Sequence, residues 1–302
     1  MSRSTFPLLL MALASALQAP PPDTEIFLAP LSSAGGKLTV GPPVNISASP
    51  GYDNQPSFTP DGAAVLFTSA RGGTAPGARP QTDIYRYHIA SKQITRVTDT
   101  PESEYSPTVT PDGAHISVIR VEADTTQRLW RFTAEGQQPE LMLTDVKPVG
   151  YHAWGDDRTL ALFVLGQPPT LQIADRTTGK AEVVAHGIGR SIQRIPEGGI
   201  SFVTREPGAA GAPPLLTIVE LDLKTRVTRP LTRAVAGASE ADIAWTPDGT
   251  LLMTHGGTLH QWKRGGEWSP AADLTALQLI GVTRIAISPK GDRIAFVAQP
   301  KP

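Results

Sequence analysis

Histidine is the side chain best suited to metal binding or proton transfer in this sequence, because the chain contains six histidines and no cysteine. Two of them, His152 and His255, stand at the ends of apolar, strand-like runs. Histidines that converge on one point can hold a divalent ion, either a transition metal or, where carboxylates join them, calcium. No spacing motif links the two, so the alternative that they are isolated polar loop residues stays open.

A second set of polar residues stands just before or beside apolar, strand-like runs. It mixes carboxylates, cations and aromatic rings, a combination that suits recognition of a polar ligand or a peptide. Solvation by water would explain the same pattern. We take as candidate binding residues Asp53, Asn54, Glu104, Tyr105, Tyr151, His152, Arg190, Glu240, Asp242, His255 and Arg284.

A hydrolytic centre finds no support in the residue pattern. Nucleophilic hydrolysis needs an activated serine with a histidine base and an acidic partner, and the Gly-x-Ser-x-Gly elbow of hydrolases is absent. We therefore assign no catalytic residue and expect no peptidase.

The candidates are positioned by a repeated β-hairpin. Residues 106–120 (SPTVTPDGAHISVIR) contain two strand-like runs joined at Pro111-Asp112-Gly113, where proline fixes φ and glycine permits a positive φ. Similar hairpins occur at 56–69, 241–255 and 283–298, with weaker copies at 151–165 and 192–204. The position of the turn proline recurs every 40 to 51 residues, six times in all.

A period of about 40–50 residues with strands in every unit is typical of a β-propeller that has one four-stranded blade per repeat. The sequence therefore predicts an all-β fold, a six-bladed propeller of antiparallel blades. The sixth repeat ends after its hairpin, and the missing outer pair is found at 25–31 and 38–47. We expect these N-terminal strands to complete the last blade. In this geometry the candidate binding residues ring one end of the central channel.

Composition restricts the compartment and the partners. The formal net charge of −1 gives no electrostatic case for nucleic acid. Residues 1–19 have the pattern of a signal peptide: Arg3, an apolar core too short for a transmembrane helix, and small residues before the expected cleavage site. We thus expect residues 20–302 to form one propeller in the periplasm or outside the cell, without a lipid-anchor cysteine or a transmembrane segment.

The repeats WTPDGTLLM (245–253), FTPDGAAVLF (58–67) and ISPKGDRIAF (287–296) resemble those of the TolB-like propeller family, which has a WD-like repeat. The resemblance covers nearly the whole chain after residue 19. It weakens at 155–158 and at 196–199, where the turn residues differ. Propellers of this family occur as envelope binding modules, beside peptidases and as enzymes. TolB itself has a further N-terminal domain that we do not expect here, so a Tol-type complex does not carry over.

These observations support three hypotheses. In the first, the chain is a monomeric, non-enzymatic propeller without a cofactor, and it binds a protein or peptide partner of the cell envelope at its channel face. The second is a metal-dependent enzyme, of lyase or lactonase type, acting on a carbohydrate or lactone in the channel. The third is a purely structural envelope component.

Overall fold

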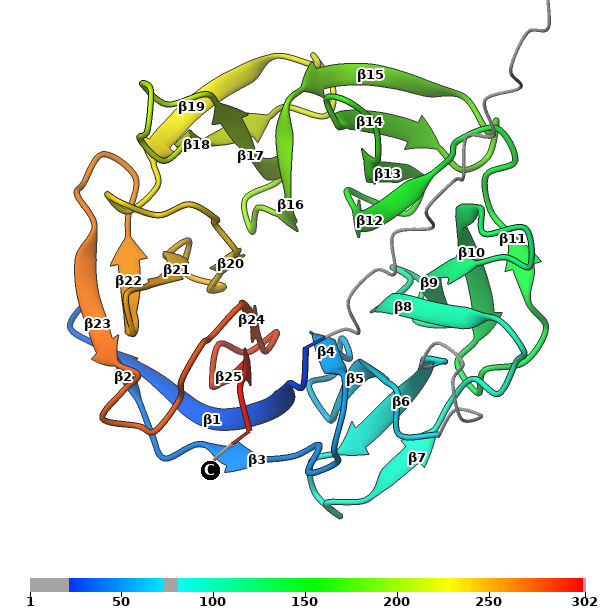
Figure 1. The fold of residues 1–302 in the computed structure, drawn as a ribbon, viewed down its shortest axis with the longest axis horizontal. Helices are drawn as coiled ribbons and strands as arrows, with labels where there is room; N and C mark the ends of the chain where they lie inside the picture. Colours follow the sequence, from blue (N-terminus) through cyan, green and yellow to red (C-terminus); the bar gives the residue numbers. More distant parts are fainter. Residues whose placement is uncertain (1–21, 73–80, 301–302) are drawn as a thin grey trace, which may run out of the picture.

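The structure is a computed structural model that describes residues 22–72 and 81–300. The described chain forms a ring of six β-sheets around a central axis (Figure 1), and each sheet is a propeller blade. The predicted six-bladed, four-stranded architecture is therefore confirmed. The strand bounds follow blade by blade, from the channel outward.

Blades one and two take the strands β4 (Asp53–Phe58), β5 (Ala64–Ser69), β6 (Asp83–His88) and β7 (Ile94–Arg96), then β8 (Ser103–Val109), β9 (His115–Val121), β10 (Gln127–Thr133) and β11 (Glu140–Leu141). Blades three and four take β12 (Val149–Trp154), β13 (Thr159–Val164), β14 (Thr170–Asp175) and β15 (Ala181–His186), then β16 (Ile188–Arg194), β17 (Ile200–Glu206), β18 (Leu215–Leu221) and β19 (Thr228–Arg233). Blade five takes β20 (Ile243–Trp245), β21 (Leu251–His255), β22 (Thr258–Trp262) and β23 (Ser269–Asp273).

The sixth blade joins the two ends of the described chain. Its inner strands are β24 (Arg284–Ile287) and β25 (Arg293–Ala298), and its outer strands are β1 (Glu25–Ala34) and β2 (Lys37–Val40). β1 pairs antiparallel with β25, Ile26 opposite Val297, and the short β3 (Val44–Asn45) also pairs with β1. The predicted closure by N-terminal strands is confirmed, and it leaves no unpaired strand at the seam.

The Pro-Asp-Gly turns owe their repetition to backbone geometry. Gly62, Gly113 and Gly249 have φ of 71°, 72° and 78°, which disfavours any side chain there. The Thr59 hydroxyl donates a 2.6 Å hydrogen bond to Asp61, whose carboxylate also accepts the Ala63 amide at 3.0 Å. Each turn thus satisfies its own polar groups and can join β-strands at a solvent-exposed face.

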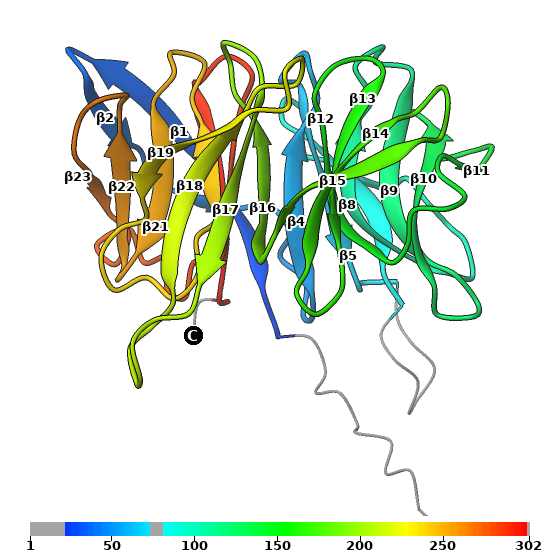
Figure 2. The same cartoon turned by 90° about the horizontal axis from the view of Figure 1, so that it is seen from above.

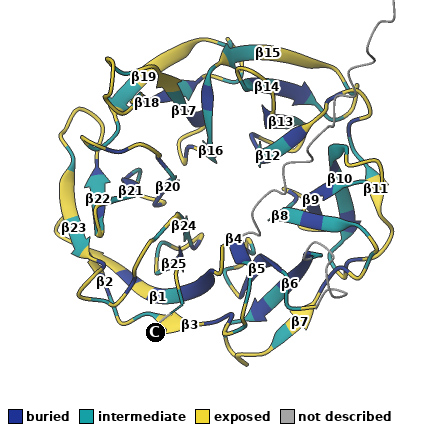
Figure 3. Ribbon diagram, viewed as in Figure 1, coloured by how far each residue is buried: buried dark blue, intermediate teal, exposed yellow. Residues whose placement is uncertain are grey.

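Apolar residues fill the spaces between adjacent blades. The second strand of each blade is mostly buried and most of the innermost strands are partly buried, whereas the outer strands β7, β15, β19 and β23 are largely exposed (Figure 3). Within a blade, β-strands alternate direction, so the Pro-Asp-Gly turns lie at one face and the loops between second and third strands at the other. The loop at 207–214 projects from that second face (Figure 2). No helix in the described part of the chain is long and apolar enough to cross a membrane.

Candidate functional site

A cavity of about 710 Å³ lies on the propeller axis. The innermost strands of all six blades contribute to its wall. Five turn prolines, all exposed, line its outer part, so the cavity opens at the face of the Pro-Asp-Gly turns. They are Pro60, Pro111, Pro196, Pro247 and Pro289. The sequence placed the candidate residues at the opposite end of the channel, and some of them line the inner end of this cavity.

The inner end is spanned by Arg284 and Tyr151, which come from blades six and three. The Arg284 Nη2 donates a 2.9 Å hydrogen bond to the Tyr151 hydroxyl, and the guanidinium carbon lies 4.9 Å from the ring centroid. Blades three and six face one another across the ring (Figure 1). The pair therefore forms a bar across the channel.

Asp242 of blade five anchors the other side of the guanidinium. Its Oδ2 lies 3.6 Å from Arg284 Nη1, and its Oδ1 accepts the Ile285 amide at 3.1 Å. Burial raises the pKa of Asp242, and the charge of Arg284 opposes that rise. A buried carboxylate or guanidinium carries a large desolvation cost when it has no partner of opposite charge. Asp242 and Arg284 offset this cost for each other, so their ion pair serves to stabilise the fold.

Other polar side chains of the lining join one blade to the next. Ser191 accepts the Ile243 amide at 3.1 Å, and the Gln55 side-chain oxygen accepts the Ser106 amide at 2.9 Å. Asp242 makes the same kind of contact with blade six. These bonds satisfy backbone donors that the inner strands leave free next to the channel.

Two tyrosines lie beside the bar but outside the cavity wall. Tyr52 and Tyr105 pack edge to face, with ring centroids 6.4 Å apart. Burial raises the pKa of Tyr52, and the nearby Arg284 opposes the shift. The sequence analysis selected Tyr105 but missed Tyr52, which stands one residue before the selected Asp53.

His152 lines the cavity but is 8% exposed, because it is packed between blades two and three. Its Nε2 lies 2.7 Å from Ser117 Oγ, which also accepts a 3.0 Å hydrogen bond from the Trp154 indole. Burial lowers the pKa of His152 to about 4, so the ring is neutral near pH 7. Ser117 is fully buried. The arrangement is that of a packing contact between blades.

The same position in blade five confirms this structural role. Trp245 donates to Ser201 Oγ at 2.8 Å, just as Trp154 donates to Ser117. The residue two places before Trp245 is Ile243, which is fully buried and corresponds to His152. His152 thus occupies an apolar position of the repeat. The serine of the neighbouring blade contacts its Nε2, whereas the buried Nδ1 has no hydrogen-bond partner among the described residues.

The two histidines proposed as metal ligands are not brought together. His255 ends β21 in blade five and is not part of the cavity wall, whereas His152 lies between blades two and three. Among residues 22–72 and 81–300, no three His, Asp or Glu side chains are grouped so as to hold a metal ion. The described residues therefore do not fit the divalent ion that the sequence suggested.

Asp53 and Glu104 lie outside the cavity. Each forms a buried ion pair within its own blade, Asp53 in blade one and Glu104 at the equivalent place in blade two. Arg71 contacts Asp53 Oδ2 at 3.2 Å, and Arg120 Nε donates to Glu104 Oε1 at 3.0 Å. Each guanidinium also lies over two aromatic rings of its own blade. Burial raises the pKa of Glu104 to about 7, although hydrogen bonding by Thr100 and the charge of Arg120 oppose the shift.

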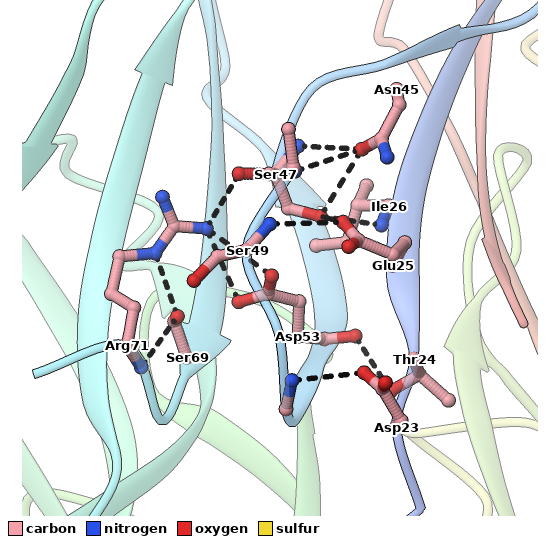
Figure 4. A network of polar contacts seen from close by, with 12 residues as sticks. Asp23, Thr24, Glu25, Ile26, Asn45, Ser47, Ser49, Asp53, Ser69 and Arg71 are labelled. Carbon is pink, nitrogen blue, oxygen red and sulfur yellow. Dashed lines mark hydrogen bonds and ion pairs between the residues drawn. The ribbon is translucent and has the colours of Figure 1, made fainter. Parts of the chain in front are cut away.

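The Asp53 pair belongs to the network that closes the ring (Figure 4). Arg71 Nη2 also donates to the Ser47 carbonyl at 3.0 Å, and Ser47 Oγ donates to Glu25 Oε2 at 2.6 Å. The neighbouring Asn54 side chain lies 3.5 Å from Thr24 Oγ1. Blade one is therefore tied to β1 by buried polar contacts.

Of the candidate residues, Tyr151, His152, Arg190, Asp242 and Arg284 line the cavity. Glu240 is exposed and pairs with Arg205 at 2.7 Å. Sequence reasoning missed Arg194, which also lines the wall. Its position could have identified it, because Arg194 stands four residues after Arg190, at the other end of the same innermost strand.

The fold and the axial cavity define a six-bladed β-propeller whose channel is spanned by the Arg284–Tyr151 pair. The sequence matches no protein-family model and no curated protein. Among solved structures, it is similar to a protein assigned as TolB from Agrobacterium tumefaciens, with a TM-score of 0.65 and 17% identity over 91% of this chain and 98% of that one.

TolB from Acinetobacter baumannii is similar with a TM-score of 0.54 and 14% identity, over 92% of this chain and 64% of that one. An oligogalacturonate lyase in complex with manganese gives a TM-score of 0.57 and 14% identity, over 86% and 80% of the two chains. The TolB-like propeller fold that the repeats predicted is thus confirmed. At these identities the likeness concerns the fold alone.

Proposed function

We propose that this chain is an exported, non-enzymatic propeller that binds a peptide segment of a protein partner in its central cavity. The observation that carries the proposal is an axial cavity of about 710 Å³ that opens at one face and is barred at its inner end. Pockets that enclose small ligands measure roughly 300–1,000 Å³. A cavity of this size suits a short segment of chain, which would enter from the face of the turns.

The wall has the composition of a binding site. It combines Tyr151, Trp154, Trp245 and three arginines with several prolines. Aromatic residues and arginine contribute most to protein-binding hot spots. Because the inner strands are held by bonds between blades, the propeller itself loses little conformational entropy when a peptide binds. The likeness to TolB structures supports the same class of function without establishing it.

Filling the cavity tests the proposal. The purified protein is applied to an array of synthetic ten-residue peptides, together with Ser57→Trp, in which an indole replaces a small side chain of the wall. Thr228→Trp, on the exposed outer strand β19, is the matched control. We expect the parent and the control to retain the same peptides and Ser57→Trp to lose them. Binding of the same peptides by Ser57→Trp would contradict the proposal. So would the absence of peptide binding by all three proteins.

We propose a periplasmic or extracellular location for this monomer, on the strength of the signal-peptide pattern. Residues 1–19 lie outside the described part of the chain, so this stays a prediction. Mass spectrometry of the protein from separated cell fractions tests it, because processing would leave a chain that begins at residue 17 or 20. Size-exclusion chromatography of the same material tests the monomer.

The alternative function is a metal-dependent enzyme acting on a carbohydrate or lactone. Its support is the shared fold of the oligogalacturonate lyase structure with manganese. The described residues supply no matching ligand set, and His152 is already bonded to Ser117. Elemental analysis and thermal melting with and without a chelator test it. One ion per chain and a lower melting temperature after chelation would favour the enzyme.

A further inference from the structure

The charges on the cavity wall have one predominant sign. Four charged side chains line it, Arg190, Arg194, Arg284 and Asp242, while His152 is neutral near pH 7. Three cations against one carboxylate give the cavity a positive potential, although the whole chain has a formal charge of −1. Concave walls of low dielectric concentrate such a potential. The cavity therefore favours an anionic ligand.

Two of the three arginines have free guanidinium groups. Arg284 is engaged by Tyr151 and Asp242. Within residues 22–72 and 81–300, Arg190 and Arg194 make no side-chain hydrogen bond and no ion pair, although both line the cavity. The charge of Arg190 acts on Asp242, which is already paired with Arg284, so one carboxylate faces two guanidinium groups at the inner end and an incoming anion would balance the excess positive charge. Arg190 is the half-buried free arginine at the inner end, and Arg194 is the exposed one near the rim.

Both free arginines belong to one strand. β16 supplies Arg190 and Arg194, but its register against β17 shifts between Ile188 and Ile192, so the Cα atoms of the two arginines lie closer than the roughly 13 Å of a regular four-residue rise. The facing part of blade one, Gln55 to Pro60, contributes no charge to the wall. The cations therefore form a line down one side of the cavity, parallel to its axis.

We infer that β16 binds the carboxylates of an acidic peptide segment, with Arg190 holding one near the inner end and Arg194 a second near the rim. Guanidinium groups bind carboxylates through paired, charge-assisted hydrogen bonds. An extended peptide advances about 3.3 Å per residue, so acidic residues about three to four apart would match the two arginines on the bulged strand. This inference rests on the proposed peptide-binding function and specifies its ligand.

The rest of the wall favours a peptide over an acidic oligosaccharide. Seven prolines line the cavity, and proline has neither an N–H group nor a polar side chain. Each sugar hydroxyl buried against these prolines would lose hydrogen bonds to water, at a cost for every unpaired group. The apolar side chains between the acidic residues of a peptide would gain from the same contact.

The test uses fluorescein-labelled ten-residue peptides with two glutamates four residues apart in a background of proline, alanine and leucine. A second peptide has glutamine in place of both glutamates, and a trimer of galacturonate serves as the competing acidic sugar. Fluorescence anisotropy and competition measure binding to the parent, Arg190→Gln and Arg194→Gln. Arg229→Gln is the matched control, because Arg229 is an exposed arginine on the outer strand of the same blade.

We expect the acidic peptide to bind the parent and the control with the same affinity. It should bind Arg190→Gln about tenfold more weakly. Its affinity for the parent should decrease as the salt concentration rises. The glutamine peptide should bind weakly and be insensitive to Arg190→Gln. Equal binding of the two peptides, both lost in Ser57→Trp, would overturn the anionic subsite and leave the peptide-binding function standing. Binding of the galacturonate trimer alone, dependent on Arg190, would overturn both in favour of a carbohydrate.

Discussion

Arg284 in blade six donates a 2.9 Å hydrogen bond to the hydroxyl of Tyr151 in blade three, at the opposite side of the ring. Their positions in the sequence are 133 residues apart. Neighbouring blades of this propeller are joined by apolar packing and by polar contacts such as that of Ser191 with the Ile243 amide, whereas blades three and six are joined across the channel itself. The contact fixes the inner end of the cavity and holds one of its three cations.

The first prediction concerns the stability of this bar. Tyr151→Phe keeps the ring and removes the acceptor, so the free energy of unfolding should fall by about 1–3 kcal/mol. Arg284→Met also leaves Asp242 buried without its cation, and the loss should reach about 3–5 kcal/mol. Urea denaturation at neutral pH measures both values.

Asp242→Asn provides the control for Arg284→Met. Added to that variant, it removes the uncompensated carboxylate and should recover part of the lost stability, although it destabilises the parent. A double variant less stable than Arg284→Met alone would contradict the assigned ion pair.

Turn chemistry made the fold predictable from sequence. Pro-Asp-Gly at 60–62, 111–113 and 247–249 marks the hairpins because only glycine adopts the required positive φ easily, as the observed angles confirm. The spacing of these turns then gave the number of blades. The weak copy at 155–158 also forms a hairpin, in which Asp156 accepts the Arg158 amide at 2.9 Å. Its carboxylate makes the same kind of bond as Asp61 in the first turn, and none of residues 156–158 has a positive φ, so this turn does not require glycine.

The side chains facing the cavity could not be predicted in the same way. Alternation along β4 would place Asp53 and Gln55 on the same side, yet Asp53 is buried between blades and Gln55 lines the cavity. The register of β4 shifts between Asn54 and Ser57, and Gln55 has φ of 57°. Such a bulge inserts one residue and breaks the period of two. Blade two repeats this at Ser106, so Glu104 is also buried between blades.

The second prediction is a pH dependence caused by Glu104. Its folded pKa is raised from 4.5 to about 7, so the folded state binds more protons than the unfolded state between these values. The contribution of Glu104 to stability is therefore full below pH 4.5 and is lost as pH rises through about 7. Glu104→Gln should remove this part of the decrease in melting temperature between pH 4.5 and about 7, as measured by thermal melts across that range. In Glu140→Gln, which changes an exposed carboxylate of the same blade, the parent's decrease should persist.

The third prediction has the opposite sign and concerns His152. Its pKa falls from 6.5 to about 4 on folding, so the unfolded state binds more protons in this interval. The contribution of His152 is therefore present above pH 6.5 and is lost as pH falls through about 4. His152→Ile, which copies Ile243 of blade five, should be less sensitive to acid than the parent. The exposed His186→Gln should behave as the parent. Equal acid sensitivity in His152→Ile would refute the assignment.

The fourth prediction concerns the closure of the ring by β1. Ile26 is fully buried opposite Val297 of β25, so Ile26→Ala should lower the free energy of unfolding by about 2–5 kcal/mol. Val44→Ala, on the adjacent β3, is the matched control; because Val44 is 61% exposed, its effect should stay within about 0.5 kcal/mol.

Deleting residues 22–47 tests the same closure more severely. The deletion removes both outer strands of blade six, exposes the edge of β25, and takes away Glu25 and Ser47 from the network around Arg71. Arg71 and Asp53 would then be left at an open seam beside unpaired backbone groups. We expect the cooperative thermal transition to disappear and aggregation through the open edge to increase. Circular dichroism during heating measures the transition, and a deletion variant that melts like the parent would show that the N-terminal strands do not close the propeller.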